Sequence, residues 1–270
     1  MSRLFVFGLG YTARHLSARL TRDGWSVAGT GSAGTVDFED ERSVLPELAA
    51  ATHILSSVPP GKESDPVLAR YEEAIRSAPA RWIGYLSSTG VYGDTAGAWV
   101  DETAPIGTGR RSARTQADLA WQALREDVRV FRLPGIYGPG RSAIERVREG
   151  RAHRIDLPDQ IFSRVHVDDI ASGVIASFTG AAGIYNLADN RPAPQNSVIE
   201  HACALLGISP PPLLSLDEAA LSPMGRAFYS ENRRVANGKA KRLLEWQPLY
   251  PSYVEGLAAC LNSSRVPARQ

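Results

Sequence analysis

The stretch at residues 5–20, FVFGLGYTARHLSARL, constrains the fold of this chain more than any other. It begins with the apolar run Phe-Val-Phe, which is typical of a strand buried on both faces. Gly8 and Gly10 follow, and apolar residues then recur at the three- and four-residue spacing of one helix face. A strand, a glycine turn and a helix in this order predict a phosphate-binding unit.

Each small residue of this unit has a predicted task. Gly8 would make the tight turn, Gly10 would let a pyrophosphate approach the backbone, and Ala13 would let the helix pack closely on the strand. The amide end of the helix, at Tyr11 and Thr12, would then point at the anion. A lone G-x-G-x-x-A is a weak signal, and a glycine turn in some other α/β protein is the alternative. The position of this one between a strand and a helix near residue 1 favours a dinucleotide site.

Composition narrows the class of protein. With 270 residues and a formal net charge of +1, the chain can bury a substantial core and carries no nucleic-acid or membrane-surface footprint. Cys203 and Cys260 lack metal or redox spacing, and the histidines show no zinc pattern. The few apolar residues before Gly8 are too short for a signal-peptide core, and no apolar run approaches the length of a membrane span. We expect a cytoplasmic protein that binds a small molecule and no metal.

Strand and helix patterns alternate along roughly the first 130 residues, as in a doubly wound parallel sheet. After the opening unit the pattern predicts strands at 25–29, 36–38, 53–58, 82–87 and 128–133, with helices at 41–50, 65–77 and 111–125. Beyond them it predicts helices at 142–149 and 167–178 and strands at 164–167 and 183–188. From Pro192 onward the chain reads as mainly helical and proline-punctuated, with a last helix at 252–261.

Several motifs then resemble one family, in order along nearly the whole chain. They are GLGYTA at 8–13, YLSSTGVYGD at 85–94, DETAP at 101–105, FRLPGIYGPGR at 131–141, SRVHVDDIASGV at 163–174, YNLADNRP at 185–192, and the tail from 233 to 259. Together they resemble the extended short-chain dehydrogenase/reductase family of the NAD-dependent epimerase/dehydratase type. The resemblance implies an α/β Rossmann fold with a small, mainly helical C-terminal substrate lobe, often a nucleotide-linked sugar as substrate, and often a homodimer. We expect the NAD(P)-binding domain at 1–140, rejoined by about 162–190, and the lobe at 141–161 and 191–270.

The family's acid/base pair is missing from this chain. The resemblance implies a tyrosine, a lysine four residues later that lowers its pKa, and a serine that holds the substrate oxygen. Ser88 matches that serine, although a serine bonded to local backbone is the alternative. Arg110 and Arg114 occupy the tyrosine and lysine positions, and no tyrosine in the chain has a lysine four residues on. An arginine does not easily release a proton, so the standard mechanism is in doubt.

Other residues could supply a proton, but simpler roles suit them better. Tyr92, Tyr137 and His166 lie in motifs at the edge of the family's cleft, where tyrosines usually pack and the histidine is satisfied by backbone. Asp168 and Asp169 are adjacent and do not converge on a helix, so we expect one of them to cap the helix that follows.

The choice between NADP and NAD is weakly coded, with a slight preference for NADP. The second predicted strand leads into Thr30-Gly31-Ser32, which lacks the acid typical of NAD enzymes, and Ser32 could donate to a 2′-phosphate. Asp37 and Phe38 match the family position beside the adenine, with a plain strand end as the alternative.

The remaining candidate residues follow from the strand ends. Cofactor contacts are expected at Ser57, Val58, Pro59, Ser87, Arg114, Pro134, Gly135 and Ile136. Arg141 and Arg164 are candidates for an anionic substrate group, because a guanidinium pairs with phosphate at two points; ordinary surface arginines are the alternative. The sequence thus predicts an NAD(P)-dependent reductase or epimerase of a nucleotide-linked sugar or related polar carbonyl compound. A non-catalytic dinucleotide sensor or scaffold is the alternative.

Overall fold

A parallel β-sheet forms the centre of the molecule in the computed structural model, which describes residues 2–62, 64–109 and 112–263. Within those residues the main sheet has six strands in the order β10-β6-β4-β3-β1-β2, and all of its pairings are parallel. The strands are β1 (Arg3–Phe7), β2 (Ser26–Gly29), β3 (His53–Ser56), β4 (Trp82–Ser88), β6 (Val128–Leu133) and β10 (Gly183–Asn186). Since β1 is flanked by β2 and β3, the order reverses there, and such a switch point is where doubly wound folds bind ligands.

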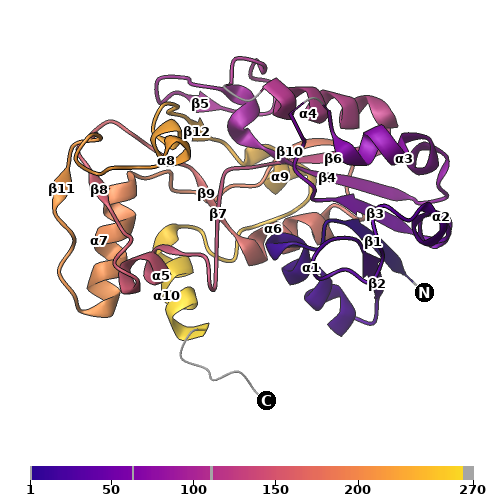
Figure 1. Cartoon of the computed structure of the whole chain (residues 1–270), viewed down its shortest axis with the longest axis horizontal. Coiled ribbons are helices and arrows are strands. Elements are labelled where there is room, and N and C mark those ends of the chain that lie inside the picture. Colours follow the sequence, from indigo (N-terminus) through magenta and orange to yellow (C-terminus); the bar gives the residue numbers. More distant parts are fainter. Residues whose placement is uncertain (1, 63, 110–111, 264–270) are drawn as a thin grey trace.

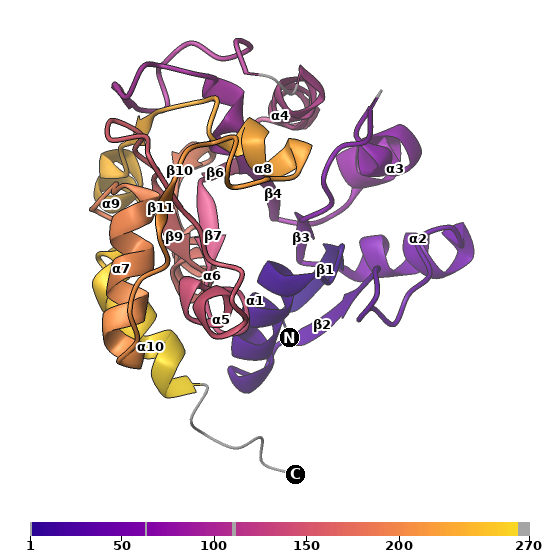
Figure 2. The same ribbon diagram turned by 60° about the vertical axis from the view of Figure 1, so that its left-hand side comes forward.

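Helices cover both faces of this sheet, as Figures 1 and 2 show. On one face lie α2 (Glu41–Ala50), α3 (Pro66–Ser77) and α4 (Ser112–Leu124); on the other lie α1 (Tyr11–Arg22), α6 (Val167–Ala176) and α9 (Gly238–Leu243). Alternate residues of β1 follow the two faces: Leu4 and Val6 pack with α1 and α6, whereas Phe5 and Phe7 pack with α2 and α3. Burial on both sides explains why the strands read as continuous apolar runs.

A second group of helices lies beyond the carboxyl ends of the strands, on the left of Figure 1. It contains α5 (Ala143–Arg148), α7 (Gln195–Leu206) and α10 (Tyr253–Ser263), which share their own apolar core, and α8 (Pro223–Phe228). Short strands outside the main sheet form parallel two-stranded pairs. They are β5 (Trp99–Val100) with β12 (Arg234–Val235), β7 (Gly135–Tyr137) with β9 (Arg164–His166), and β8 (Arg154–Ile155) with β11 (Leu213–Leu214).

The predicted fold class is confirmed, and most predicted elements lie within two or three residues of the observed ones. The predicted strand at 36–38 is wrong. The loop after β2 instead folds back, with Val36 N donating to Gly29 O at 3.1 Å and Gly34 pressed against Thr30. Phe38 still packs on Phe7, at 6.3 Å between ring centroids, so its apolar character reflects burial in a loop.

No helix of the described residues is long and apolar enough to cross a membrane.

Candidate functional site: a cleft at the carboxyl ends of the strands

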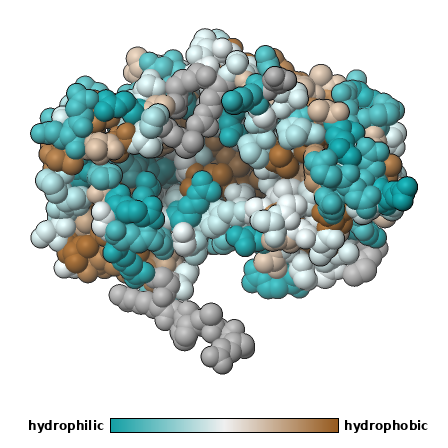
Figure 3. Space-filling model, in the orientation of Figure 1, coloured by the Kyte–Doolittle hydropathy of each residue, from teal (hydrophilic) through white to brown (hydrophobic). Residues whose placement is uncertain are grey.

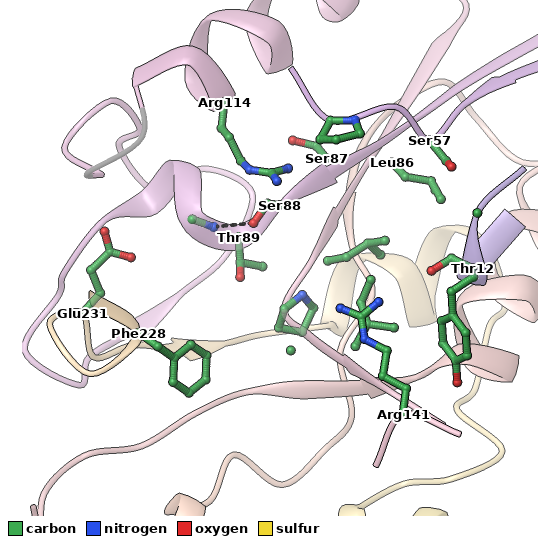
Figure 4. A pocket seen from close by; sticks show the side chains of 18 of the residues that line it. Thr12, Ser57, Leu86, Ser87, Ser88, Thr89, Arg114, Arg141, Phe228 and Glu231 are labelled. Atoms are coloured by element: carbon green, nitrogen blue, oxygen red, sulfur yellow. Dashed lines mark hydrogen bonds between the residues drawn. The ribbon is translucent and has the colours of Figure 1, made fainter. Parts of the chain in front are cut away.

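A cavity of about 560 Å³ lies where β1, β3, β4 and β6 end. Its lining runs from the start of α1 past Ser57 and Ser88 to Phe228 on α8, so both halves of the molecule contribute to it (Figure 4). In the space-filling view, hydrophobic atoms gather in the recess between the halves (Figure 3). The volume falls within the range of about 300–1,000 Å³ that small-molecule and cofactor sites occupy.

The glycine loop at the end of β1 is held from below by its neighbours. Gly8 has a φ of 86°, a region that favours glycine, and Gly10 N donates to Gly8 O at 2.7 Å to close the turn. Thr30, which is buried, accepts from Leu9 N at 2.7 Å and from Gly8 N at 3.1 Å through its hydroxyl. Ser57 Oγ donates to Gly8 O at 2.7 Å. The loop conformation is therefore fixed by β2 and β3 on either side.

Gly10 is the point where this loop opens to the cavity. It is the N-cap residue of α1, and as a glycine it has no side chain that could cap the helix. A Cβ built on it would meet no atom within 4 Å. The first N–H groups of an α-helix lack partners within the helix and carry the positive end of its dipole. An uncapped helix start with open space above a glycine is a site that suits an anion.

The end of β4 is tied to α4 and β6 by a buried polar network around Asp118, which is 0% exposed. Ser87 Oγ donates to this carboxylate at 2.5 Å, and Arg132 donates to it through Nε at 3.1 Å and Nη2 at 2.8 Å. Arg132 Nη1 also donates to Tyr92 OH at 3.1 Å, and Tyr92 OH donates to Asn186 Oδ1 at 2.8 Å. Burial raises the pKa of Tyr92, while the Arg132 charge opposes that rise.

Ser88, the next residue of β4, lines the cavity. Its Oγ accepts from Gly90 N at 3.1 Å, which caps the short 3-10 helix η1 (Thr89–Tyr92). Ser88 thus lines the cavity and also makes the local backbone bond, and its role in holding a substrate oxygen stays a prediction. Accepting that bond leaves the hydroxyl hydrogen able to donate elsewhere.

Arginines line opposite sides of the cavity. Arg114 extends from the first turn of α4 toward Ser88, and Arg141 lies on the side of Thr12 (Figure 4). The Arg141 guanidinium also lies 5.6 Å from the centroid of the Tyr11 ring. Tyr11 OH donates to Pro139 O at 3.1 Å, and burial raises the pKa of this phenol above its usual value.

The far end of the cavity is formed by residues that the sequence analysis missed. Phe228 is 44% exposed and stacks on Phe162 at 4.2 Å, and Glu231 pairs with Arg233 at 2.9 Å. The one signal for this region is that the resembling tail begins at Arg233. Also missed were lining residues next to predicted ones, namely Leu86, Thr89, Gly90 and Leu133.

Many predicted residues come together at this cavity. Those that line it are Gly10, Tyr11, Thr12, Ser57, Pro59, Ser87, Ser88, Arg114, Pro134, Gly135, Ile136 and Arg141. Gly8 and Ala13 do not line it: Gly8 packs against Ser57 and Val58, and Ala13 is fully buried in the core. Val58, Ser32, Asp37 and Phe38 are outside the lining; Ser32 is exposed, and the Asp37 carboxylate accepts from Glu39 N at 3.0 Å.

The predicted substrate role of Arg164 is wrong. Its guanidinium is buried away from the cavity and donates to Phe162 O at 2.8 Å, Ala193 O at 3.0 Å and Gln195 Oε1 at 2.9 Å. Burial lowers the pKa of this side chain to about 10. Arg110, the predicted replacement for the family tyrosine, lies outside the described residues.

The other suggested proton donors are packing residues. Tyr137 is buried and donates to Ser252 O at 3.3 Å, and neither it nor Tyr92 lines the cavity. His166 accepts from Asp168 N at 3.2 Å and so caps α6, a role predicted for an aspartate; burial lowers its pKa to about 4. The Asp169 carboxylate instead accepts from Leu249 N at 2.6 Å, and burial raises its pKa to about 6.

Among the residues that the structure describes, no group of three or more histidine, cysteine, aspartate or glutamate side chains could hold a metal ion.

The chain was compared with protein-family models, solved structures and curated proteins. A search against protein-family models found no match. The solved structure of a functionally unknown conserved protein from Silicibacter pomeroyi is 41% identical, with a TM-score of 0.87 over 97% of this chain and 99% of that one. The human epimerase family protein SDR39U1, solved with NADPH, has a TM-score of 0.77 at 18% identity over 96% of this chain and 99% of that one.

Among curated proteins, a Streptomyces sp. protein named 3-diazoavenalumate denitrifying reductase is 26% identical over 90% of this chain and 91% of its own length. At 18% identity, the likeness to the human protein shows the fold alone. The identity to the Silicibacter pomeroyi protein is high enough, over nearly both whole chains, to show common family membership. The chain therefore belongs to the family of that protein and has the fold of the extended short-chain dehydrogenases/reductases of the NAD-dependent epimerase/dehydratase type.

Proposed function

We propose that this protein binds a nicotinamide dinucleotide in the cavity and reduces or epimerises a polar carbonyl compound, such as a nucleotide-linked sugar. The single observation that carries the proposal is Gly10, an exposed glycine at the uncapped start of α1, with open space where its Cβ would be. The pyrophosphate of a dinucleotide is the anion that such a helix start accepts in doubly wound folds.

The residues present fit the group. Backbone N–H groups at Gly10, Tyr11 and Thr12 would hold the pyrophosphate, and Ser57 and Pro59 would border the ribose. Residues 134–136 would lie along the nicotinamide, near Ser88. When bound, the dinucleotide would supply or remove a hydride. The NADPH solved with the human epimerase family protein and the name of the Streptomyces reductase support this choice.

The substrate would enter from the side of the helical lobe, which we propose comprises residues 141–161 and 191–270. Phe228, Glu231 and Arg233 come from that part of the chain and line the far end of the cavity. We favour NADP over NAD, because the exposed loop at Ser32 presents no carboxylate to repel a 2′-phosphate.

A second candidate function is a non-catalytic dinucleotide sensor. The observation that favours it is that no tyrosine in the chain has a lysine four residues on, so the usual acid/base pair is missing. A sensor would bind the dinucleotide as tightly as an enzyme does and would differ in showing no turnover.

The test is in two steps. Calorimetric titration with NADPH and NADH comes first, and we expect saturable binding with NADPH the tighter ligand. Loss of nicotinamide absorbance is then followed with a panel of 4-keto nucleotide sugars, where turnover supports the enzyme. Binding without turnover across the panel favours the sensor, and no binding of either dinucleotide refutes both functions.

A further inference from the structure

The end of β4 presents a hydroxyl group to the cavity. Ser88 lines the cavity there, and its hydroxyl accepts from Gly90 N at 3.1 Å, which orients it and leaves its hydrogen to donate. In Figure 4 the Arg114 guanidinium comes from α4 and points toward the same serine. A hydroxyl donor and a guanidinium donor therefore converge from two different elements on one part of the cavity.

The helix that carries Arg114 is anchored by the polar network around Asp118, one helical turn further along. Arg114 and Asp118 are four residues apart in α4 and so share one helix face. Asp118 is clamped to Ser87 at 2.5 Å and to Arg132 at 2.8 Å, which locks α4 against β4 and β6. The clamp thus holds the backbone of α4, which carries Arg114, against the end of β4, which carries Ser88. Donors that stabilise developing charge need this kind of rigid support.

The possible proton donors among the described lining residues, Tyr11 and Glu231, do not lie between Ser88 and Arg114. Tyr11 is on the opposite side of the cavity, and its hydroxyl is committed to Pro139 O at 3.1 Å. Glu231 extends from a different part of the chain and lies apart from Ser88 in Figure 4. Its carboxylate pairs with Arg233 at 2.9 Å. The side chain that extends from α4 toward Ser88 in that view belongs to Arg114, a permanent cation, which attracts negative charge and cannot donate a proton at ordinary pH.

We propose that Arg114 and Ser88 form an oxyanion site, so that the reaction relies on stabilising a negative oxygen in place of direct proton donation. The inference rests on the proposed function. In a reduction, the substrate carbon gains a hydride with its electron pair, and the π pair of the C=O bond moves onto the oxygen. Arg114 N–H and Ser88 O–H hold the resulting alkoxide, and water later protonates it. A bound dinucleotide would supply the hydride with its electron pair, and the carbonyl would be reduced by those two electrons.

The test uses acetate as a probe of an oxygen anion, titrated by calorimetry into the full-length protein saturated with NADP⁺. We expect Arg114→Gln to weaken acetate binding about 10- to 100-fold, as for a lost hydrogen bond to a charged group, and Ser88→Ala to weaken it about 5- to 10-fold. Arg114→Lys keeps the charge and should restore most of the affinity. Arg22→Gln removes the same charge from an exposed position outside the lining of the cavity and should change acetate binding less than threefold.

A second readout separates this role from the cofactor contact that the sequence predicts for Arg114. The dissociation constant for NADPH should change less than threefold in Arg114→Gln. The proposal is overturned if that variant loses NADPH affinity while acetate binding is unchanged, or if the wild-type complex binds no acetate. Failure of the wild-type protein to bind NADPH would instead refute the proposed function.

Discussion

Two alanine substitutions in the glycine loop should affect different properties. Gly10→Ala should weaken dinucleotide binding, whereas Gly8→Ala should lower the free energy of unfolding. At Gly10 the φ of −84° and ψ of −165° are ordinary extended values, and a Cβ would meet no atom within 4 Å. Ala is a poorer N-cap than Gly, but it also restricts the unfolded chain, and these effects nearly cancel. We expect Gly10→Ala to change the free energy of unfolding by less than about 1 kcal/mol.

The same methyl group would stand where the pyrophosphate approaches the start of α1. Loss of one hydrogen bond to a charged group costs about 1.5–3 kcal/mol, which corresponds to about a 10- to 100-fold weaker dissociation constant. We therefore expect calorimetry to show a loss of NADPH affinity of that size in Gly10→Ala, at nearly unchanged stability in urea. Wild-type affinity in this variant would refute the close approach at Gly10.

Gly8→Ala is the matched control. Gly8 has a φ of 86°, and its Cβ would lie 2.9 Å from Cγ2 of Val58. A left-handed backbone costs about 1–2 kcal/mol in a non-glycine residue, and the contact with Val58 adds to it. We expect Gly8→Ala to lower the free energy of unfolding by about 1–3 kcal/mol in urea denaturation. Equal stability of the two variants would contradict this account of the loop.

Three further substitutions test the packing of the sheet and its loops. Asp118→Ala leaves the buried guanidinium of Arg132 without its carboxylate and should cost about 3–5 kcal/mol in urea denaturation; a cost below about 1 kcal/mol would contradict the clamp. Burial lowers the pKa of His53 to about 4, so the folded state resists protonation, and stability should fall as pH drops from about 6.5 to about 4. His53→Phe should remove about 2 kcal/mol of that loss, measured by denaturation at pH 7 and 4.5, and an unchanged pH dependence would refute the assignment. Gly34→Ala would place a Cβ 2.3 Å from Gly29 O and should lower the melting temperature, whereas an unchanged temperature would mean that the loop is loosely packed.

The strands were predictable because burial on both faces leaves a continuous apolar run, as in β1 and β3. That signal fails at Val36 and Phe38, whose burial arises from a loop that folds back through Gly31 and Gly34. Sequence periodicity records which side chains are buried, but it does not record whether their backbone pairs with a strand. The sheet edge at β2 is a consequence of that loop.

The candidate site divides in the same way. Residues at the glycine loop and strand ends were predictable because the fold brings those ends together. Phe228 and Glu231 were not, since no local pattern tells that α8 reaches over the cavity. Arg164 was misassigned because its sequence position says nothing of the carbonyl groups that surround its guanidinium.

The main sheet cannot be completed until the chain has reached its last strand, β10. β10 pairs with β6, and α6 packs in the same apolar core as α1, yet both come after the chain has passed through α5. A fragment that stops at residue 140 would leave β6 as an open edge and would expose the apolar face that α6 covers. During synthesis the sheet therefore stays incomplete until Asn186 has emerged. We expect the whole chain to unfold in one cooperative transition, with the dinucleotide adding stability to the helical lobe as well as to the sheet.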